Sequence, residues 1–337
     1  MKTQTIVLAS RPKGEPTAAQ FRFETQELPP LQAGQVLLKT LYVSVDPYMR
    51  GRMNAGKSYV PPFEVGAPIT GGVVAQVVES QLNSLPVGSV VVGNLPWQEY
   101  SVSNGQGLNR IPTDQAPISY FLGLLGMPGL TAYFGLLDIC QPKAGETVVV
   151  SGAAGAVGMV VGQLAKIQGA RVIGTAGSDE KVAYLKKLGF DEAINYKTTP
   201  DINQALAAAA PNGVDCYFDN VGGAISDAVY NNLNKQARIA ICGQISMYNV
   251  TDVPVGPRPE SKLLTTSSLM KGFIVSDYFS QWPAGVQKLS EWYRDGKLQF
   301  EETITEGFDQ IPAAFLGLFK GENTGKAVVK VAEPTAQ

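Results

Sequence analysis

The sequence feature that most constrains the fold is a glycine-rich turn between an apolar strand and a helix, within residues 146–158. Val148 to Val150 is a β-branched run typical of a buried parallel strand, and residues 157–168 continue with helical spacing. A helix that begins at such a turn directs its N–H groups and the positive end of its dipole toward the turn, where a pyrophosphate can bind. The stretch therefore predicts a dinucleotide site.

The glycines of this turn follow the pattern Gly-x-x-Gly-x-x-Gly, with Ala153 where the usual dinucleotide fingerprint has its first glycine. The alternative is a Gly/Ala loop that only packs a helix tightly on a strand, but the flanking strand and helix favour the nucleotide. The residues that we expect to contact the cofactor here are Gly152, Gly155, Ala156, Val157 and Gly158.

Composition excludes several classes of function. The 27 Lys and Arg residues nearly balance the 29 Asp and Glu residues among 337, which argues against a nucleic-acid partner. Residues 1–10 hold too short an apolar core for a secretory signal, and no later apolar run is long enough to cross a bilayer. We therefore expect a cytoplasmic protein of two ordinary domains that does not enter membranes.

The chain contains no histidine, which excludes Ser-His-Asp and Cys-His catalysis and every zinc site that needs a histidine ligand. The three cysteines, Cys140, Cys216 and Cys242, are widely spaced and cannot alone form a four-ligand structural zinc site. We expect them to be reduced and mostly buried, and we expect no bound metal.

Residues 1–120 read as short strands broken by Gly and Pro, most clearly at 35–45, 69–79 and 89–93, which predicts a mainly antiparallel, barrel-like β domain. Pro47 is suited to open a helical turn within 46–53. After residue 120 the pattern changes to an apolar helix at 126–136, followed by regular alternation of strands and helices. Strands are predicted at 148–150, 171–176, 193–194, 214–219, 238–242 and 272–275, and helices at 157–168, 179–188, 201–210, 225–233 and 283–295.

This alternation predicts a doubly wound parallel sheet of the Rossmann type. Strands return after Phe300 and end at residues 327–331, so we expect the terminal segment to rejoin the first domain. The predicted boundaries are 1–122 for the first part of the catalytic domain, 123–297 for the nucleotide-binding domain and 298–337 for the returning segment.

The end of the second strand of this domain indicates which nucleotide binds. NAD-binding versions of this fold carry an acidic side chain there, which accepts hydrogen bonds from the ribose 2′-OH. Here Gly177 and Ser178 occupy that place, and Lys181 lies one turn into the next helix, within reach of a 2′-phosphate. The pattern favours NADP(H), although Asp179 and Glu180 would contact the ribose if the strand ended two residues later.

The chain resembles the zinc-independent medium-chain dehydrogenases/reductases, because many motifs of this family occur in it in the same order. Within the family it resembles the group that contains leukotriene B4 12-hydroxydehydrogenase/prostaglandin reductase, plant alkenal double-bond reductases and bacterial curcumin reductase. The resemblance covers nearly the whole chain and leans toward the curcumin-reductase-like bacterial branch. The motifs are Val45–Arg50, Gly126–Tyr133, Gly152–Gly158, Gly177–Lys181, Asn195–Lys197, Phe218–Gly223, Cys242–Asn249 and Gly321–Lys326.

This resemblance implies a GroES-like catalytic domain split around the nucleotide domain, NADPH as hydride donor, and a homodimer. It implies that Lys181 and Tyr196 hold the 2′-phosphate, while Asn220 contacts the ribose side of the cofactor. The resemblance also implies three further groups of cofactor contacts. Cys242, Gly243 and Ser246 line the path of the cofactor, Phe273, Ile274 and Val275 flank the nicotinamide, and Asn323 reaches the cofactor from the returning segment.

The family reaction is reduction of the carbon-carbon double bond of an α,β-unsaturated ketone or aldehyde, in which negative charge develops on the carbonyl oxygen. Without histidine, phenol hydroxyls and the cofactor ribose are the natural donors to that oxygen. Tyr248, at the carboxyl edge of the sheet, is our first choice, and Tyr48 from the first domain is the second, although both tyrosines could be structural. Proton delivery to the α-carbon is expected from water.

Two alternatives remain at this point: an NADPH quinone reductase, and an NADPH-binding protein without catalysis. The substrate pocket cannot be assembled from sequence. Tyr59, Phe63, Trp97 and Tyr278 are candidates for its apolar walls, but each is as easily explained by ordinary packing.

Overall fold

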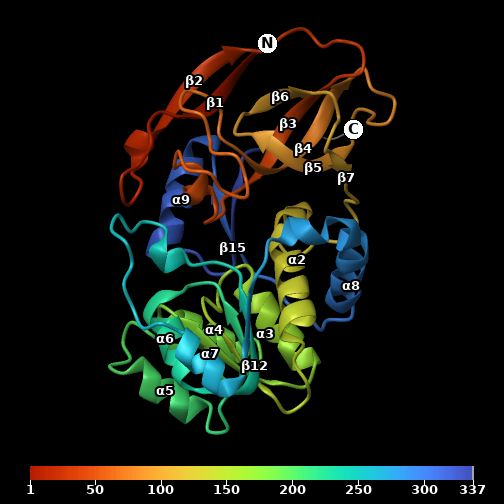
Figure 1. The fold of residues 1–337 in the computed structure, drawn as a ribbon. Coiled ribbons are helices and arrows are strands. Elements are labelled where there is room, and N and C mark those ends of the chain that lie inside the picture. Colours follow the sequence, from red (N-terminus) through yellow and green to blue (C-terminus); the bar gives the residue numbers. More distant parts are fainter. Residues whose placement is uncertain (336–337) are drawn as a thin grey trace. The chain divides into compact units, whose positions relative to one another are not determined.

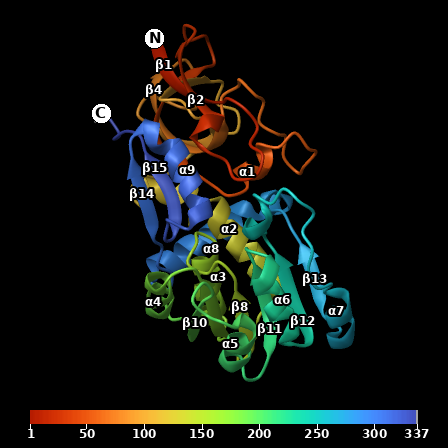
Figure 2. The same cartoon turned by 90° about the vertical axis from the view of Figure 1, so that its left-hand side faces the viewer.

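The computed structural model describes residues 1–335, which divide into two compact units. Of these residues, 1–122, 303–323 and 327–335 belong to unit 1, and 123–302 and 324–326 belong to unit 2. Figures 1 and 2 show the course of the chain through both. Each unit has its own sheets, so each is described by itself.

Unit 1 is built on antiparallel strands. Its larger sheet has the order β14-β15-β3-β4-β5-β7, with β6 also paired to β3, and a second sheet pairs β1 with β2. The strands are β1 (Lys2–Leu8), β2 (Phe21–Glu27), β3 (Val36–Ser44), β4 (Thr70–Ser80), β5 (Val90–Pro96), β6 (Tyr100–Ser103), β7 (Asn109–Arg110), β14 (Glu302–Glu306) and β15 (Lys326–Lys330). The predicted mainly antiparallel β domain is confirmed.

The central strands of unit 1 are buried on both faces and contribute to two apolar clusters, one of which includes Leu41 and Val74. The larger cluster takes the residues of the other face. Leu38, Val43 and Val73 are fully buried there with Phe315 of helix α9 (Ile311–Lys320). Residues 46–53 interrupt the strands as expected, since Pro47 precedes the short helix α1 (Met49–Arg52). The remaining short helices of the unit are η1 (Ala18–Gln20), η2 (Ile118–Leu122) and η6 (Phe308–Gln310).

Unit 2 contains a six-stranded parallel sheet in the order β10-β9-β8-β11-β12-β13. Its strands are β8 (Thr147–Val150), β9 (Arg171–Ala176), β10 (Glu192–Asn195), β11 (Val214–Asp219), β12 (Leu233–Ile241) and β13 (Leu269–Gly272). The first strand, β8, and the fourth, β11, are neighbours, so the strand order reverses between them. Ligands of open parallel sheets bind at the carboxyl ends of the strands at such a reversal.

Helices cover both faces of this sheet (Figures 1 and 2). On one face α2, α3 and α8 pack together, and on the other α5 and α6 pack together, with α7 beside α6. The α-helices are α2 (Met127–Phe134), α3 (Gly158–Ile167), α4 (Asp179–Lys187), α5 (Ile202–Ala209), α6 (Gly223–Asn231), α7 (Glu260–Thr266) and α8 (Trp282–Arg294). A π-helical turn, η3 (Gly135–Cys140), continues α2, and 3-10 turns occur at η4 (Ile245–Met247) and η5 (Val275–Gln281).

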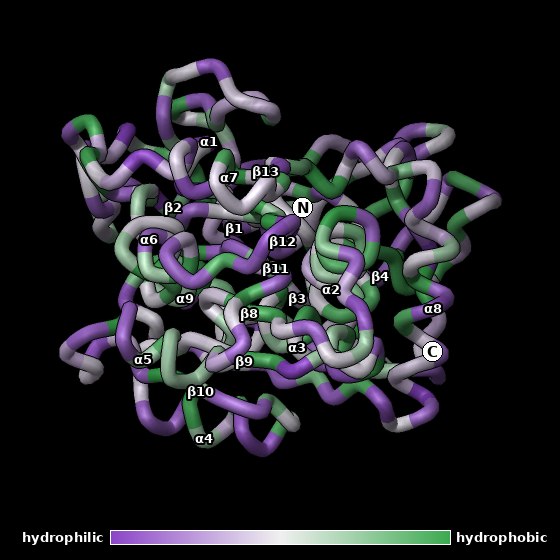
Figure 3. Tube along the Cα trace, turned by 60° about the horizontal axis from the view of Figure 1, so that its bottom comes forward, coloured by the Kyte–Doolittle hydropathy of each residue, from purple (hydrophilic) through white to green (hydrophobic). Residues whose placement is uncertain are grey.

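The central strands of this sheet are apolar along their whole length because both of their faces are covered. All four residues of β8 are buried, and β8 and β9 are coloured as mainly hydrophobic in Figure 3. Val149 packs toward α5 and α6 with Tyr217 and Ile239. The predicted architecture of a β-rich domain and a doubly wound parallel sheet is confirmed.

The sixth strand lies earlier than we predicted. The sequence pointed to residues 272–275, but the strand is β13 (Leu269–Gly272), which pairs in parallel with Arg238–Ile241 of β12. The prediction was wrong because β13 is an edge strand and mostly exposed, so its sequence lacks the continuous apolar run of a central strand. The apolar run that we used begins at Phe273, which is buried just beyond the end of the strand.

Candidate active site

The glycine-rich turn lies at the carboxyl end of β8 and has the geometry of a phosphate-binding turn. Gly152 adopts a φ of +58°, a left-handed conformation that favours glycine. At Gly158 a Cβ would lie 2.5 Å from the carbonyl oxygen of Gly152 and 2.6 Å from the Cα of Ala153. The first residue of α3 must therefore lack a side chain for the helix to start this close to the turn.

Hydrogen bonds fix the turn from two sides. The amide of Ala153 donates to Thr175 O in β9 at 3.0 Å, and the amide of Gly325 donates to Ala154 O at 2.7 Å. Ala156, Val157 and Gly158 lie at the beginning of α3, where N–H groups have no acceptor within a helix. The backbone thus offers amides and the positive end of a helix dipole to an anion.

The next strand ends as the NADP(H) interpretation requires. β9 ends at Ala176, and Ser178 is the N-cap of α4, where its side chain accepts from the amide of Lys181. Asp179 accepts a hydrogen bond from Asn195 Nδ2 at 2.7 Å. Hydrogen bonds from its own backbone amide and then from Ser178 lower the pKa of Glu180. Both acids are therefore engaged locally at the start of α4, and the strand ends where the sequence placed it.

Two lysines and a tyrosine gather beside this strand end. Burial lowers the pKa of Lys181, and the neighbouring positive charge of Lys197 lowers it further. A Cβ at Gly177 would lie 2.9 Å from Tyr196 Oη and 3.3 Å from Lys197 Cε. Glycine leaves room for the ends of the tyrosine and of the second lysine beside the strand end, and the two lysines form a cationic cluster that suits a phosphate.

A buried carboxylate, Asp219, organises the end of β11. It is fully buried, and its Oδ1 accepts from Ser151 Oγ at 2.9 Å, from Tyr217 Oη at 2.8 Å and from the amides of Val221 and Gly222 at 3.0 and 2.9 Å. Its Oδ2 accepts from Ser226 Oγ at 2.7 Å. Asp219 therefore joins the end of β8, the loop after β11 and helix α6.

Asn220 is held directly on the glycine-rich turn. Its amide donates to Ser151 Oγ at 2.9 Å, and its Nδ2 donates to Ser151 O at 2.8 Å. The loop after β12 lies against the same segment, because the amides of Cys242 and Gly243 donate to Asp219 O and the amide of Ser246 donates to Val221 O. The structure thus brings Asn220, Cys242, Gly243 and Ser246 together at the reversal of strand order.

Tyr248 lies in this loop, and its hydroxyl oxygen accepts a hydrogen bond from the amide of Gln244 at 3.4 Å. A Cβ at Gly243 would lie 3.0 Å from that hydroxyl, so the phenol crosses closely over the backbone. Burial raises the pKa of Tyr248 above its usual value, and the hydroxyl is therefore protonated at neutral pH. Because its oxygen accepts from the backbone, the proton can be donated to another group.

Cys242 and Phe273 directly follow the carboxyl ends of β12 and β13. Burial raises the pKa of the Cys242 thiol to about 12, with a further contribution from the charge of Asp219, so it remains protonated at neutral pH. Phe273 is buried and meets the ring of Phe218 edge-on, with centroids 6.2 Å apart. Ile274 and Val275 follow directly after it, beyond the carboxyl end of β13.

Two predicted site residues belong to unit 1. Tyr48 precedes α1 and is half-buried, and burial together with the negative charge of Asp46 raises its pKa well above the usual value. Asn323 lies between α9 and β15. Each is described only within its own unit, so their approach to the nucleotide-binding residues stays a prediction.

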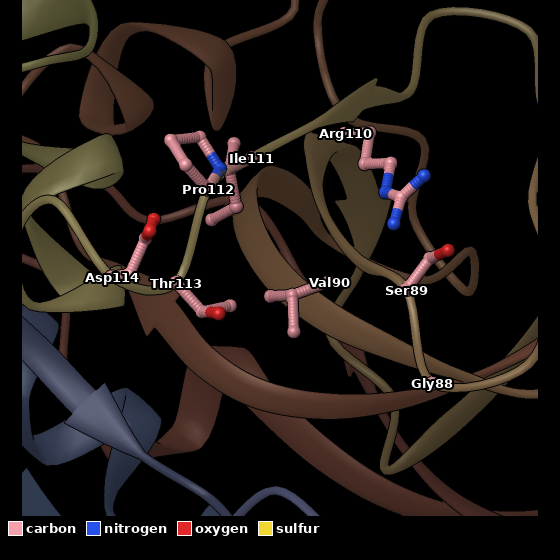
Figure 4. Close-up of a pocket in the computed structure, with 8 residues that line it drawn as sticks. All are labelled: Gly88, Ser89, Val90, Arg110, Ile111, Pro112, Thr113 and Asp114. Carbon is pink, nitrogen blue, oxygen red and sulfur yellow. The ribbon is translucent and has the colours of Figure 1, made fainter.

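The four aromatic candidates for apolar walls have different environments. Phe63 and Trp97 are buried in the core of unit 1, and we assign them to packing. Tyr59 is 61% exposed, and the hydroxyl of Tyr278 donates to Asp138 Oδ2 at 2.6 Å. A concavity of about 630 Å³ between residues 88–90 and 110–114 contains none of the predicted site residues (Figure 4).

Within residues 1–335, no group of three or more His, Cys, Asp or Glu side chains has an arrangement that could hold a metal ion. Over the same residues, no helix is both long enough and apolar enough to span a membrane.

The fold and this site define a class of protein. Residues 4–111 match the family described as the N-terminal domain of oxidoreductase, and residues 156–291 match the family described as zinc-binding dehydrogenase. With the relatives described next, the chain belongs to the medium-chain dehydrogenases/reductases, in their zinc-independent reductase group, which confirms the predicted family.

Three curated relatives cover almost the whole chain. YfmJ of Bacillus subtilis (strain 168), provisionally named as an NADP-dependent oxidoreductase, is 62% identical over 98% of each chain. Prostaglandin reductase 1 of Rattus norvegicus is 50% identical over 98% of this chain and 99% of its own. The NADPH-dependent curcumin reductase of Escherichia coli (strain K12) is 44% identical over 97% of this chain and 96% of its own.

Among solved structures, CurA from Vibrio vulnificus in complex with NADPH matches with a TM-score of 0.93 and 44% identity. It covers 98% of this chain and the match spans 100% of the CurA chain. The fold of this chain is therefore that of a protein solved with NADPH bound.

Sequence reasoning missed three residues that shape the site. Ser151 and Asp219 hold the loop of Asn220. Ser151 directly follows β8 and Asp219 is the last residue of β11, and this position at the end of a central strand is the sequence signal that could have identified them. Lys197 follows Tyr196 within a motif that we quoted, but only the fold shows that it lies beside Lys181.

Proposed function

We propose that this protein reduces the carbon-carbon double bond of α,β-unsaturated ketones or aldehydes with NADPH. The observation that carries the proposal is that the cationic cluster of Lys181 and Lys197 and the loop of Tyr248 both follow the carboxyl ends of strands of one parallel sheet. Relatives named for prostaglandin, curcumin and 2-alkenal reduction match over most of the chain and support it.

The residues present fit NADPH. The turn has glycine at the two positions that need it, since Gly152 has a φ of +58° and a Cβ at Gly158 would lie 2.5 Å from Gly152 O, and helix α3 therefore begins directly at the turn, where a pyrophosphate would bind. Lys181, Tyr196 and Lys197 would hold the 2′-phosphate, and Asn220 would contact the ribose. Bound NADPH supplies the hydride that the β-carbon of the substrate receives.

The chain's own contribution is to stabilise the negative charge that develops on the substrate's carbonyl oxygen. Tyr248 donates a hydrogen bond to this oxygen, and Tyr48 provides a second donor from unit 1. Both hydroxyls are protonated at neutral pH, since the usual pKa of tyrosine is about 10 and burial raises it further for both residues. Neither gives up its proton readily, so we expect water to protonate the α-carbon.

The activity is tested by following NADPH oxidation with short alkenals, long oxo-fatty acids, diaryl enones and quinones in one series. We expect turnover with enones and alkenals in which only the double bond is reduced, as product analysis would show. Faster turnover of quinones would make the protein a quinone reductase. NADPH binding with background oxidation across the whole series would identify a binding protein without catalysis.

Replacing Tyr248 by phenylalanine removes only the hydroxyl. We expect the kcat of enone reduction to fall by about 10-fold or more, while NADPH affinity is nearly unchanged. Tyr100→Phe in β6 is a matched control and should behave as wild type. An unchanged kcat for Tyr248→Phe would remove this residue from the mechanism.

We also propose that the protein is cytoplasmic and that it forms a homodimer. Within residues 1–335, β12 is the one strand that pairs with β13, so the outer edge of β13 is available to another strand. Apolar side chains lie near this edge, with Leu264 81% and Leu269 53% exposed. A second copy that pairs along β13 would cover both.

Light scattering after size exclusion tests the dimer. The wild-type protein should have twice the 35.9 kDa mass of one chain, and the double substitution Leu264→Glu and Leu269→Lys should give single chains. A wild-type mass of one chain would contradict the homodimer. A dimer that persists in the double variant would place the contact on another surface.

A further inference from the structure

The segment that follows β13, residues 273–281, leaves the sheet beside the loop that carries Tyr248. Ile241 and Gly272 are partners in the register of β12 and β13, and each is the last residue of its strand. Cys242 and Phe273 therefore leave the carboxyl edge of the sheet next to each other. This segment lies wholly within unit 2.

The strand order gives a direction to a dinucleotide bound at this edge. Lys181 and Lys197 follow β9 and β10, the glycine-rich turn follows β8, and Asn220 follows β11. A dinucleotide with its 2′-phosphate at the lysines and its pyrophosphate at the turn directs its other end toward β12 and β13. Residues 273–281 are therefore the segment of unit 2 that follows the last strand on the nicotinamide side.

Side chains of two helical elements hold the first half of this segment. A Cβ at Gly135 of η3 would lie 2.5 Å from Phe273 Cζ, so the glycine lets the ring of Phe273 approach η3. Trp282, the first residue of α8, donates from Nε1 to Val275 O at 3.1 Å. The backbone between Phe273 and Val275 is thus held at both ends.

Tyr278 holds the second half of the segment on α2 and η3. Its ring stacks on the ring of Phe134 with centroids 4.6 Å apart and 11° between the planes, and its hydroxyl donates to Asp138 Oδ2 at 2.6 Å. Burial and the carboxylate of Asp138 raise the pKa of Tyr278 to about 12, so the hydroxyl remains a donor at neutral pH. The contact is a short hydrogen bond to a charged acceptor, which is stronger than a neutral one.

The acceptor of Tyr278 is part of a structured element. Asp138 lies in the π-helical turn η3, a rare geometry that often occurs at functional sites. Arg238 of β12 holds the end of this turn, because its Nε donates to Cys140 O at 2.8 Å while its guanidinium pairs with Glu146. Asp138 is therefore fixed relative to the sheet.

We infer that Tyr278 and Asp138 are positioning residues for the nicotinamide end of NADPH. They hold residues 273–275 in place before the cofactor binds, so that binding does not cost the free energy of ordering this segment. The inference rests on the proposed function only in requiring NADPH at this edge of the sheet. It gives Tyr278 a role different from that of an apolar wall of the substrate pocket.

Isothermal titration calorimetry of the full chain with NADPH and with 2′,5′-ADP tests the inference. 2′,5′-ADP carries the 2′-phosphate but has no nicotinamide, so it does not depend on residues 273–275. We expect Tyr278→Phe to weaken NADPH binding by about 3- to 10-fold and to leave the affinity for 2′,5′-ADP unchanged. Tyr278→Ala also removes the stacked ring and should weaken NADPH binding further, again without an effect on 2′,5′-ADP.

A double-mutant cycle tests whether the two residues act together. Asp138→Ala removes the acceptor of the same hydrogen bond, so its combination with Tyr278→Phe should weaken NADPH binding no more than the stronger single variant does. Ser280→Ala is the matched control, because it removes an exposed hydroxyl from the same segment. Lys271→Ala removes the ammonium that lies 3.9 Å from Asp138 Oδ2. Both controls should bind NADPH as the wild type does.

The outcomes separate the inference from the proposed function. Wild-type NADPH affinity in Tyr278→Phe, equal weakening of NADPH and 2′,5′-ADP, or losses that multiply in the double variant would each overturn the inference. Enone turnover by the wild-type protein would leave the reductase proposal in place in all three cases. Selective weakening of NADPH in a protein that turns over no enone would support the inference and contradict the reductase proposal.

Discussion

Lys181→Ala is expected to weaken NADPH binding by about 10- to 100-fold while NADH binding changes little. A charge-assisted hydrogen bond to a phosphate contributes about 1.5 to 3 kcal/mol, and 1.4 kcal/mol corresponds to tenfold in affinity. NADH lacks the 2′-phosphate, so it has no group for this lysine to hold. Dissociation constants for both nucleotides, measured by fluorescence titration, give the selectivity directly.

The control for this variant is Lys187→Ala, an exposed lysine in the last turn of the same helix. It should leave both affinities unchanged. The preference for NADPH should also fall as the pH rises through the lowered pKa of Lys181, because the neutral amine no longer attracts the phosphate. Equal weakening of NADPH and NADH by Lys181→Ala would contradict the assignment of the 2′-phosphate site.

Asp219→Ala is expected to destabilise the protein by about 3 to 5 kcal/mol, since it leaves buried donors without their acceptor. Two serines, a tyrosine and two backbone amides donate to this carboxylate. Because Ser151 also holds Asn220, we expect NADPH affinity to fall together with stability. Denaturant unfolding, followed by a probe in unit 2, measures the loss.

Asp215→Ala is the matched control for this effect. Asp215 lies in the same strand but is partly exposed, and it accepts from the amide of Thr147 and from Asn234 Nδ2, both at 2.8 Å. Its loss should cost about 1 kcal/mol and leave NADPH affinity intact. Similar losses in the free energy of unfolding of the two variants would contradict the prediction that the buried carboxylate of Asp219 stabilises the protein more than the partly exposed carboxylate of Asp215.

The sequence predicted unit 2 well because its signals are local. A β-branched run such as Val148–Val150 is buried on both faces, and the turn after it needs glycine at Gly152 and Gly158 for steric reasons that the sequence displays. The edge strand β13 escaped prediction because an exposed strand has no apolar run.

The sequence predicted site residues only where all the residues that define a feature lie in one continuous segment. The replacement of an acid by Gly177 and Ser178 was visible because the acid would follow the strand directly. The pairing of Lys181 with Lys197 and the contact of Tyr278 with Asp138 depend on how distant segments fold together. Such contacts leave no periodic signal in a single sequence.

The position of β15 bears on how the protein is made. β15 pairs with β3, so two late strands, β14 and β15, complete a sheet whose other strands come from the first 110 residues. During synthesis the part of the β3 edge at Tyr42–Ser44 therefore stays unpaired until residues 326–330 leave the ribosome, whereas the six strands of the parallel sheet are already available by residue 272. Translation order thus favours early folding of the nucleotide-binding unit, and removal of β15 would leave an unpaired strand edge that favours aggregation.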